Sequence, residues 1–347
     1  MKEIIDGLPP RRLTMEALAQ LVGVNKSTVS RAMRPGTTFY RSDTAQRIRA
    51  IAESMNFQMD RNAASLRTQR TGTIGVLVPR LSDNLQAVFY ESVVNACMAR
   101  DIVALVAVTG DDVEAERRAG SALLGRRVDG LILTSTRVHG QFPAQLEDRK
   151  VPFVLAIRQD GEGRASVVGE DRKGGYLVTR HLIELGHRRI AMIAGPDHAS
   201  TALDRRVGYV EAHHEAGLPV DKRFVLKSMF RWQDGYEIAL RLLASDDPPT
   251  AIFAVNDETA FGVVAAARTS GFDLPRQLSI VGYDDIPSAS HPPLPLTTAR
   301  MDIATLAERA VDLLCARIDG RPAESGTIPV SLIVRESTAP PEPHQSR

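Results

Sequence analysis

Two groups of side chains in this sequence have the types and the spacing to bind a ligand. The first lies in the stretch KSTVSR (residues 26–31), where Lys and Arg can donate to the edges of nucleic-acid bases and hydroxyls to phosphates. The second is spread along the rest of the chain, where Arg, Asp, Asn and Ser follow short apolar runs. No GxGxxG, P-loop, GxSxG or HExxH pattern occurs, so no catalytic residue is predicted.

Two short helices joined by a tight turn are expected to position the first group. Thr14 can cap a helix over MEALAQL, Gly23 can end it in a left-handed conformation, and Asn25 can cap a second helix over KSTVSRAMR. A third helix is expected from Ser42 or Asp43 onward. A small residue, a turn-forming glycine and an apolar residue occur at the spacing of a helix-turn-helix: Ala19, Gly23 and Val29.

The second of these helices would lie in the major groove of DNA, with its N-terminal residues against the bases. Lys26 and Arg31 are predicted to contact base edges, and so is Ser27, for which a solvated surface position is an equal alternative. Thr28 and Ser30 are better placed for phosphates. The candidate DNA contacts of this region are Thr14, Asn25, Lys26, Ser27, Thr28, Ser30 and Arg31.

The charge distribution favours a polyanionic partner for the N-terminal region. The whole chain has a net charge of +1, but residues 1–70 hold twelve Lys and Arg against six Asp and Glu, which leaves the remaining residues at −5. A basic head on an acidic body indicates contact of the head with nucleic acid, and salt-sensitive DNA binding is expected to reside in the head alone. A solvated charged face is the alternative explanation.

The rest of the chain alternates short apolar runs with helical stretches, as expected of buried parallel strands flanked by helices. The runs are IGVLV (74–78), IVALVAV (102–108), VDGLILT (128–134), PFVLAI (152–157), RIAMIAG (189–195), AIFAV (251–255) and LSIVGY (278–283). These are too many units for one small sheet. The predicted fold is an N-terminal all-α helix-turn-helix domain plus an α/β core of two doubly wound parallel-sheet lobes.

Ligands of such sheets bind just beyond the carboxyl ends of the strands. The polar residues that follow the apolar runs include Arg80, Asn84, Ser135, Arg158, Arg205, Asn256 and Asp284. Carboxylates and amides accept from hydroxyls, and arginine donates in a fork, so the predicted ligand is small and polyhydroxylated or anionic. Three neighbouring residues have simpler explanations: Asp257 as a helix cap, Asp285 as a loop-stabilising carboxylate and His187 as a structural residue.

Motifs along nearly the whole chain resemble the lactose/galactose-repressor (LacI/GalR) family. LTMEALAQLVGVNKSTVSRAMR resembles its N-terminal signature, and LIELGHRRIAMIAG, DRRVGY, NDETAFG, LSIVGYDD and PPLPLTT resemble its periplasmic-binding-protein-like core. LTSTRVHG and KSTVSRAMR look similar to gluconate-type members. The resemblance implies a ligand-responsive transcriptional regulator, a repressor that binds a palindromic operator as a homodimer and is switched by a sugar or sugar acid between the lobes.

The resemblance also assigns a hinge after the third helix. Asn62, Ala63 and Leu66 match the family's hinge in type and spacing, and Leu66 would wedge between base pairs in the minor groove. Met59 and Asp60 stand where the family has Pro-Asn, so the chain departs from the pattern at this point. An ordinary apolar linker residue is the alternative for Leu66.

By the same resemblance, five residues of the core belong to the ligand pocket. Arg205, Asn256 and Asp284 would hold ligand oxygens. Trp232 would stack on the apolar face of a sugar ring, and Ile303 would line the pocket. Trp232 is equally well explained as a core residue.

The expected domains are residues 1–58 (helix-turn-helix), 59–70 (hinge) and 71–347 (effector-binding core), with a first lobe of residues 71–168 and 299–326 and a second lobe of residues 169–298 and 327–340. No apolar run approaches about 18 residues, no secretory signal is recognised, and Cys97 and Cys315 form no disulfide or metal pattern. A cytoplasmic protein without cofactor, metal or membrane contact is therefore expected. The C-terminal stretch lacks heptads, which favours a dimer over a tetramer. Alternatives are a nucleobase or nucleoside effector, a solute-binding receptor and a sugar-handling enzyme.

Overall fold

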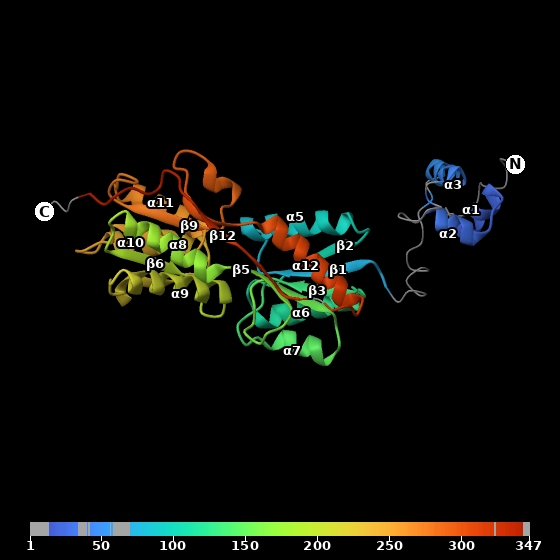
Figure 1. Cartoon of the computed structure of the whole chain (residues 1–347), viewed down its shortest axis with the longest axis horizontal. Coiled ribbons are helices and arrows are strands. Elements are labelled where there is room, and N and C mark those ends of the chain that lie inside the picture. Colours follow the sequence, from blue (N-terminus) through green and yellow to red (C-terminus); the bar gives the residue numbers. More distant parts are fainter. Residues whose placement is uncertain are drawn as a thin grey trace. The chain divides into compact units, whose positions relative to one another are not determined.

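The computed structural model describes residues 14–33, 40, 42–55, 57, 70–322 and 324–342. The chain divides into two compact units, Met1–Thr71 and Gly72–Arg347, and each is described by itself (Figure 1). Within the described residues, no helix combines the length and the apolar character needed to cross a membrane.

Three helices form the described part of the first unit: α1 (Met15–Val22), α2 (Lys26–Ala32) and α3 (Asp43–Ser54). The Thr14 side chain accepts from the backbone N–H of Ala17, and Gly23 ends α1 with a φ of 73°, as the sequence predicts. Asn25 precedes α2, but its side chain makes no capping hydrogen bond. Asn25 therefore occupies the predicted N-cap position, but it caps α2 only through its backbone carbonyl, which accepts from the N–H of Thr28 at 2.8 Å.

Apolar side chains from the three helices form one small core. Its buried members are Leu18, Ala19, Val29, Ala32, Ala45, Ile48, Ala52 and Phe57. Arg49 of α3 ties the helices together, since it donates to the carbonyls of Ala32 and Tyr40 at 2.9 Å each. The Ser42 side chain caps α3 by accepting from the N–H of Ala45 at 3.2 Å.

The first lobe of the second unit is a parallel sheet with helices on both faces. Its strands are β1 (Thr73–Val78), β2 (Val103–Val108), β3 (Gly130–Leu133), β4 (Phe153–Ile157), β5 (Ser166–Gly169) and β11 (Gly326–Ile328), in the order β11-β5-β4-β3-β1-β2. Figure 1 shows α5 (Asn84–Met98) beside α12 (Ile303–Ile318). The other helices of this lobe are α6 (Val113–Gly125) and α7 (Gln141–Asp148).

The second lobe repeats this plan with one antiparallel edge strand. Its strands are β6 (Ile190–Ala194), β7 (Val225–Lys227), β8 (Ala251–Ala254), β9 (Ser279–Tyr283), β10 (Thr297–Met301) and β12 (Val330–Ile333), in the order β12-β10-β9-β8-β6-β7. Only the β10–β12 pair is antiparallel among the described strand pairs. The helices are α8 (Asp171–Glu184) with α9 (Ser200–Glu215), and α10 (Trp232–Leu243) with α11 (Asp257–Thr269). The predicted fold class of two doubly wound lobes is confirmed.

The chain crosses between the lobes three times. The first crossing follows β5, the second lies between β10 and α12, and the third separates β11 from β12. Because β10 extends to Met301 and β11 to Ile328, the second and third crossings lie slightly farther along the chain than the expected boundaries at residues 298/299 and 326/327. The crossings bring the carboxyl ends of both sheets to a common junction.

Candidate ligand and nucleic-acid sites

Asp111 is the centre of a charged cluster at the carboxyl end of the first sheet. Its carboxylate accepts from Arg158 Nη1 at 2.7 Å and from Arg80 Nη2 at 3.3 Å. Its backbone carbonyl accepts from Arg137 Nη1 at 2.7 Å. Burial disfavours the charge on Asp111, but Arg158 and Arg80 outweigh burial and hold the pKa of the carboxyl below its usual value. Two guanidinium groups therefore pair with the Asp111 carboxylate, and a third is held by the backbone carbonyl of the same residue.

A second carboxyl, that of Glu116, lies beside this cluster. Glu116 of α6 is 4% exposed and accepts from the Ser135 hydroxyl at 2.7 Å. Burial raises the pKa of Glu116, while the hydrogen bond from Ser135 and the charges of Arg137 and Arg158 oppose the rise. The cluster thus contains three guanidinium groups and two carboxyls. Ser135, predicted to contact ligand, has its hydroxyl engaged with Glu116.

Groups of the second lobe meet the cluster around Asp111. Arg80 Nη1 donates to the carbonyl of Met229 at 3.2 Å, and the Arg158 guanidinium lies 5.4 Å from the ring centroid of Phe230. His198 Nε2 lies 3.9 Å from the central carboxylate. The two lobes therefore share this cluster, and a ligand held here would contact both.

The junction is closed by further hydrogen bonds but contains unsatisfied polar atoms. Among the described residues, the buried atoms Thr136 Oγ1 and His198 Nε2 have no hydrogen-bond partner. Buried polar groups normally have partners, so these atoms indicate that a ligand or water completes the site. The bonds that join the lobes are Asn84 Nδ2 to Glu258 Oε1 (2.6 Å), Val138 N to His198 O (2.9 Å) and Gln159 N to Ser200 Oγ (2.9 Å).

Arg205 of α9 is enclosed within the second lobe and is 2% exposed. Its guanidinium donates to Asp171 Oδ1 at 2.7 Å, to the Val255 carbonyl at 2.6 Å and to Asp284 Oδ1 at 3.1 Å. It also lies 3.5 Å from the ring centroid of Tyr283. Burial raises the pKa of both carboxyls. These bonds use three of the five N–H donors of the guanidinium, and through them Arg205 positions Asp171 and Asp284.

Glycines make the approach of Arg205 to Asp171 possible. A Cβ on Gly175 of α8 would lie 2.2 Å from the Arg205 carbonyl oxygen, and a Cβ on Gly208 of α9 would lie 2.0 Å from the carbonyl oxygen of Arg172. Both distances are too short for any side chain. The close packing of α8 against α9 therefore depends on these two residues and fixes the ion pairs of Arg205.

Asn256, not Asp257, caps α11. Asn256 Oδ1 accepts from the backbone N–H three residues later at 3.0 Å, and its Nδ2 donates to the carbonyl of Phe230 at 3.3 Å. The expected cap by Asp257 is wrong, because Asp257 is already inside the helix and its carboxyl accepts from the Thr298 hydroxyl at 2.6 Å and from the N–H of Ile286 at 2.9 Å. Burial raises the pKa of Asp257 to about 7.

The remaining candidate pocket residues begin two helices. Trp232 at the start of α10 is 37% exposed, and its ring stacks on Tyr236 with centroids 5.2 Å apart. Trp232 is therefore not a core residue and offers an exposed aromatic surface. Ile303 at the start of α12 is half-buried and packs against both large cores of this unit.

Asp285 and His187 have the expected structural roles. Asp285 pairs with Arg300 and Arg335 and so holds the loop after β9. His187 Nε2 lies 2.9 Å from the carbonyl of Ala339 and so ties the C-terminal segment to the second sheet. Within the described residues, no group of three His, Cys, Asp or Glu could hold a metal ion.

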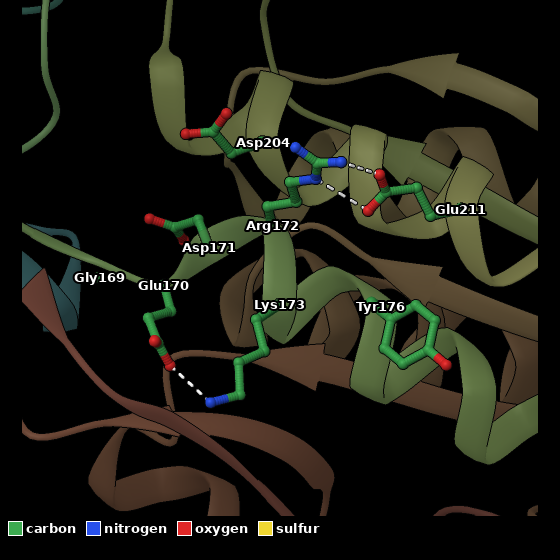
Figure 2. A pocket seen from close by; sticks show the side chains of 8 residues that line it. All are labelled: Gly169, Glu170, Asp171, Arg172, Lys173, Tyr176, Asp204 and Glu211. Carbon is green, nitrogen blue, oxygen red and sulfur yellow. Dashed lines mark hydrogen bonds and ion pairs between the residues drawn. The ribbon is translucent and has the colours of Figure 1, made fainter.

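A separate depression of about 440 Å³ lies at the start of α8 (Figure 2). Its lining residues are Gly169, Glu170, Asp171, Arg172, Lys173, Tyr176, Asp204 and Glu211. Figure 2 shows Arg172 paired with Glu211 and Lys173 paired with Glu170. Because these charged side chains satisfy one another, we assign no ligand to this depression.

Helix α2 presents a polar face above the small core of the first unit. Val29 and Ala32 are buried, whereas the side chains predicted to contact DNA are exposed or half-buried: Lys26, Ser27 and Arg31 are exposed, Thr28 and Ser30 half-buried. Lys26 pairs with Glu16 at 3.1 Å, and both side chains are exposed, so the pair is weak. Thr14 and Asn25 are exposed at the helix starts. Asn62, Ala63 and Leu66 lie outside the described residues.

Sequence reasoning missed four residues of the junction: Asp111, Thr136, His198 and Phe230. The first three follow β2, β3 and β6, so the rule that ligands bind beyond strand ends could have found them. The strand before Phe230 spans only Val225–Lys227 and gave no recognisable apolar run.

The comparisons with known proteins extend over most of the chain. The family described as "Periplasmic binding protein-like domain" matches residues 179–338. A relative named HTH-type transcriptional repressor PurR, from Glaesserella parasuis serovar 5, is 31% identical over 333 residues, which are 93% of this chain and 98% of the relative. The solved structure of the lac repressor dimer bound to operator and the anti-inducer ONPF has a TM-score of 0.83 at 26% identity and covers 95% of this chain and 100% of that chain. The complex of the transcriptional regulator CelR with cellobiose has a TM-score of 0.71 at 29% identity and covers 93% and 99%.

A helix-turn-helix unit followed by a two-lobed α/β core defines a ligand-responsive transcriptional regulator, which is not an enzyme. The chain belongs to the LacI family of such regulators. The family resemblance stated from the sequence motifs is therefore confirmed. The likeness to gluconate-type members stays a prediction.

Proposed function

We propose that this protein is a repressor whose N-terminal unit binds operator DNA and whose core binds a small anionic effector between its lobes. The observation that carries the proposal is the charged cluster around Asp111, because both lobes contribute to it. An effector in this cluster contacts both lobes at once and can favour one relative orientation of the lobes over another. One relative is named a transcriptional repressor, and one similar solved structure is described as a repressor dimer bound to operator. Both descriptions support the DNA-binding part of the proposal.

The chemistry of the cluster favours a sugar acid. Arg80, Arg137 and Arg158 bring three guanidinium groups to one cluster, and each keeps N–H donors that could bind a carboxylate of the effector. The unpartnered atoms of Thr136 and His198 suit the hydroxyls of such a compound. Asn84, Ser135, Arg205, Asn256, Asp284 and Ile303 shape the rest of the pocket in this proposal, and Trp232 supplies an aromatic surface.

A purine is the second candidate effector. Relatives of this chain are named PurR, and Phe230 beside the cluster and the exposed ring of Trp232 could stack on a base. An uncharged base brings no carboxylate for the three guanidinium groups to bind, which is why we place a sugar acid first.

In the proposed DNA complex, Lys26, Ser27 and Arg31 read base edges while Thr28 and Ser30 contact phosphates, with Thr14 and Asn25 at the helix starts. The hinge residues Asn62, Ala63 and Leu66 would act in the minor groove. A homodimer would present two such helices to a palindromic operator.

An exposed apolar edge on the first lobe supports dimer formation. β2 is an edge strand, and its terminal residues Val103 and Val108 are 46% and 52% exposed, while Met98 at the end of α5 is 72% exposed. A second copy of the chain that covers this edge would remove it from water.

Thermal unfolding in the presence of aldonates, uronates, neutral sugars and purines tests the effector assignment, because a ligand that binds the native state raises the melting temperature. A sugar acid is expected to raise it, and Arg80→Gln should weaken that binding about tenfold or more by removing a charge-assisted hydrogen bond. Arg118→Gln, an exposed charge on α6 of the same lobe, is the control and should leave binding unchanged. A shift with purines alone would favour the second candidate, and no shift with either class would refute an effector site at the cluster.

A further inference from the structure

Exposed basic side chains gather at the end of the first lobe where its strands begin. Arg126 lies in the turn before β3, Arg149 and Lys150 lie in the turn before β4, and Arg317 and Arg321 lie at the end of α12. All five residues are exposed. The effector cluster lies beyond the opposite, carboxyl ends of the same strands, so these residues form a different surface.

Three of these basic residues surround a depression of about 460 Å³. Its lining residues are Glu147, Lys150, Val151, Pro152, Phe153, Arg317, Gly320 and Arg321. The Arg317 guanidinium lies 5.9 Å from the ring centroid of Phe153. Among the described residues, neither Lys150 nor Arg317 forms an ion pair, so the depression offers two charges to an anion.

Most acidic side chains at this end are already engaged. Glu147 accepts from Arg164 at 2.9 Å, and Asp312 accepts from Arg100 at 2.6 Å. Asp319 pairs with Arg321 at 2.9 Å, while Asp148 stays exposed. Glu147 and Asp312 are thus paired with arginines outside the depression, and Lys150 and Arg317 keep their charges for another partner.

The covalent path of the chain connects this end to the DNA-binding unit. β1 begins at Thr73, directly after the segment that leads from the first unit, and the N–H of Gly72 donates to Asp129 Oδ2 at 2.8 Å just before β3. Each residue of a connecting segment spans at most about 3.6 Å. The segment between the two units therefore limits how far DNA bound by the first unit can lie from this end of the core.

We propose that this basic end of the first lobe, centred on Lys150 and Arg317, binds backbone phosphates of DNA that flanks the site read by the helix-turn-helix. Lysine and arginine bind phosphates without reading sequence, so the contact adds affinity and salt dependence, not specificity. The inference rests on the proposed DNA-binding function. It replaces the expectation that salt-sensitive DNA binding resides in the head alone.

The test uses the full chain, the double variant Lys150→Gln/Arg317→Gln, and an operator duplex selected by the wild-type protein from a random library. Affinity is measured over a range of salt concentrations, on the minimal site and on the same site extended by about one helical turn (~10 base pairs) on each side. On the extended duplex the double variant should bind about tenfold more weakly, and its salt slope should fall by about 0.9 for each phosphate that the variant no longer neutralises. On the minimal site it should match the wild type.

The matched control is Lys222→Gln/Arg268→Gln, which removes two exposed charges from the second lobe and should bind both duplexes like the wild type. Equal affinity of the wild type and of Lys150→Gln/Arg317→Gln for the extended duplex would overturn the proposal. If the control variant lost as much affinity as Lys150→Gln/Arg317→Gln, the proposal would also be overturned, because the loss would then follow from net charge alone. A wild-type chain that selects no DNA at all would refute the proposed function itself, a result distinct from either of these.

Discussion

Arg205→Met should destabilise the core far more than loss of an exposed arginine does. Methionine keeps an apolar stem but removes three donated hydrogen bonds, at 2.7, 2.6 and 3.1 Å. Asp171 and Asp284, 4% and 7% exposed, stay buried without their cation. Removing one partner of a buried ion pair costs about 3–5 kcal/mol, and Arg205 serves two carboxyls, so the free energy of unfolding should fall by at least about 3 kcal/mol near neutral pH.

The loss should depend on pH in a defined direction. Burial already raises the pKa of Asp171 and of Asp284, and Arg205 is the group whose charge opposes that rise. Without Arg205 both pKa values rise further. A carboxyl whose pKa is higher in the folded than in the unfolded state costs stability above the unfolded pKa, and the cost disappears as the pH falls and the folded state takes up the proton. The deficit of the variant should therefore shrink on acidification.

Urea unfolding at about pH 7.5 and about pH 5.5, followed by circular dichroism, measures this deficit. Arg206→Met is the matched control, because Arg206 pairs with the half-exposed Asp197 and its loss should cost less than about 1 kcal/mol. Adding Asp284→Asn to Arg205→Met should restore part of the stability. A deficit below about 1 kcal/mol near neutral pH, or an equal deficit at both pH values, would refute the reasoning.

Two further predictions concern α2 and α11. Arg31→Ala should abolish operator binding in a mobility-shift assay while the effector still raises the melting temperature, because Arg31 lies on the exposed face of α2; tight, specific binding by this variant would remove α2 as the recognition helix. Asp257→Asn should gain stability relative to the wild type as the pH rises from about 4 to about 7. Over that interval the unfolded carboxyl loses its proton first, while the folded one, with a pKa of about 7, resists ionisation. Unfolding free energies measured across this range would contradict the assignment if the difference stayed constant.

The sequence by itself determined the elements and the family. The helix-turn-helix is marked by a small residue, a turn-forming glycine and an apolar residue at Ala19, Gly23 and Val29. These positions lie within a few helical turns of one another, so local geometry is enough to predict the motif. The apolar runs predicted the strands for the same reason, and polar residues at strand ends marked the edge of the sheets where the charged cluster lies. Arg80 and Arg158 were found in this way.

Tertiary structure alone decided which side chain meets which. Arg80 contacts the carbonyl of Met229, and Asn84 contacts Glu258, although the partners are 149 and 174 residues apart in the sequence. Sequence order cannot give such pairs, because strand order in each sheet differs from chain order and three crossings set the lobes against each other. For that reason Arg205, expected to hold ligand oxygens, donates three hydrogen bonds within the second lobe, to Asp171, Val255 and Asp284. Asp111, which no pattern singled out, is the residue that Arg80, Arg137 and Arg158 contact.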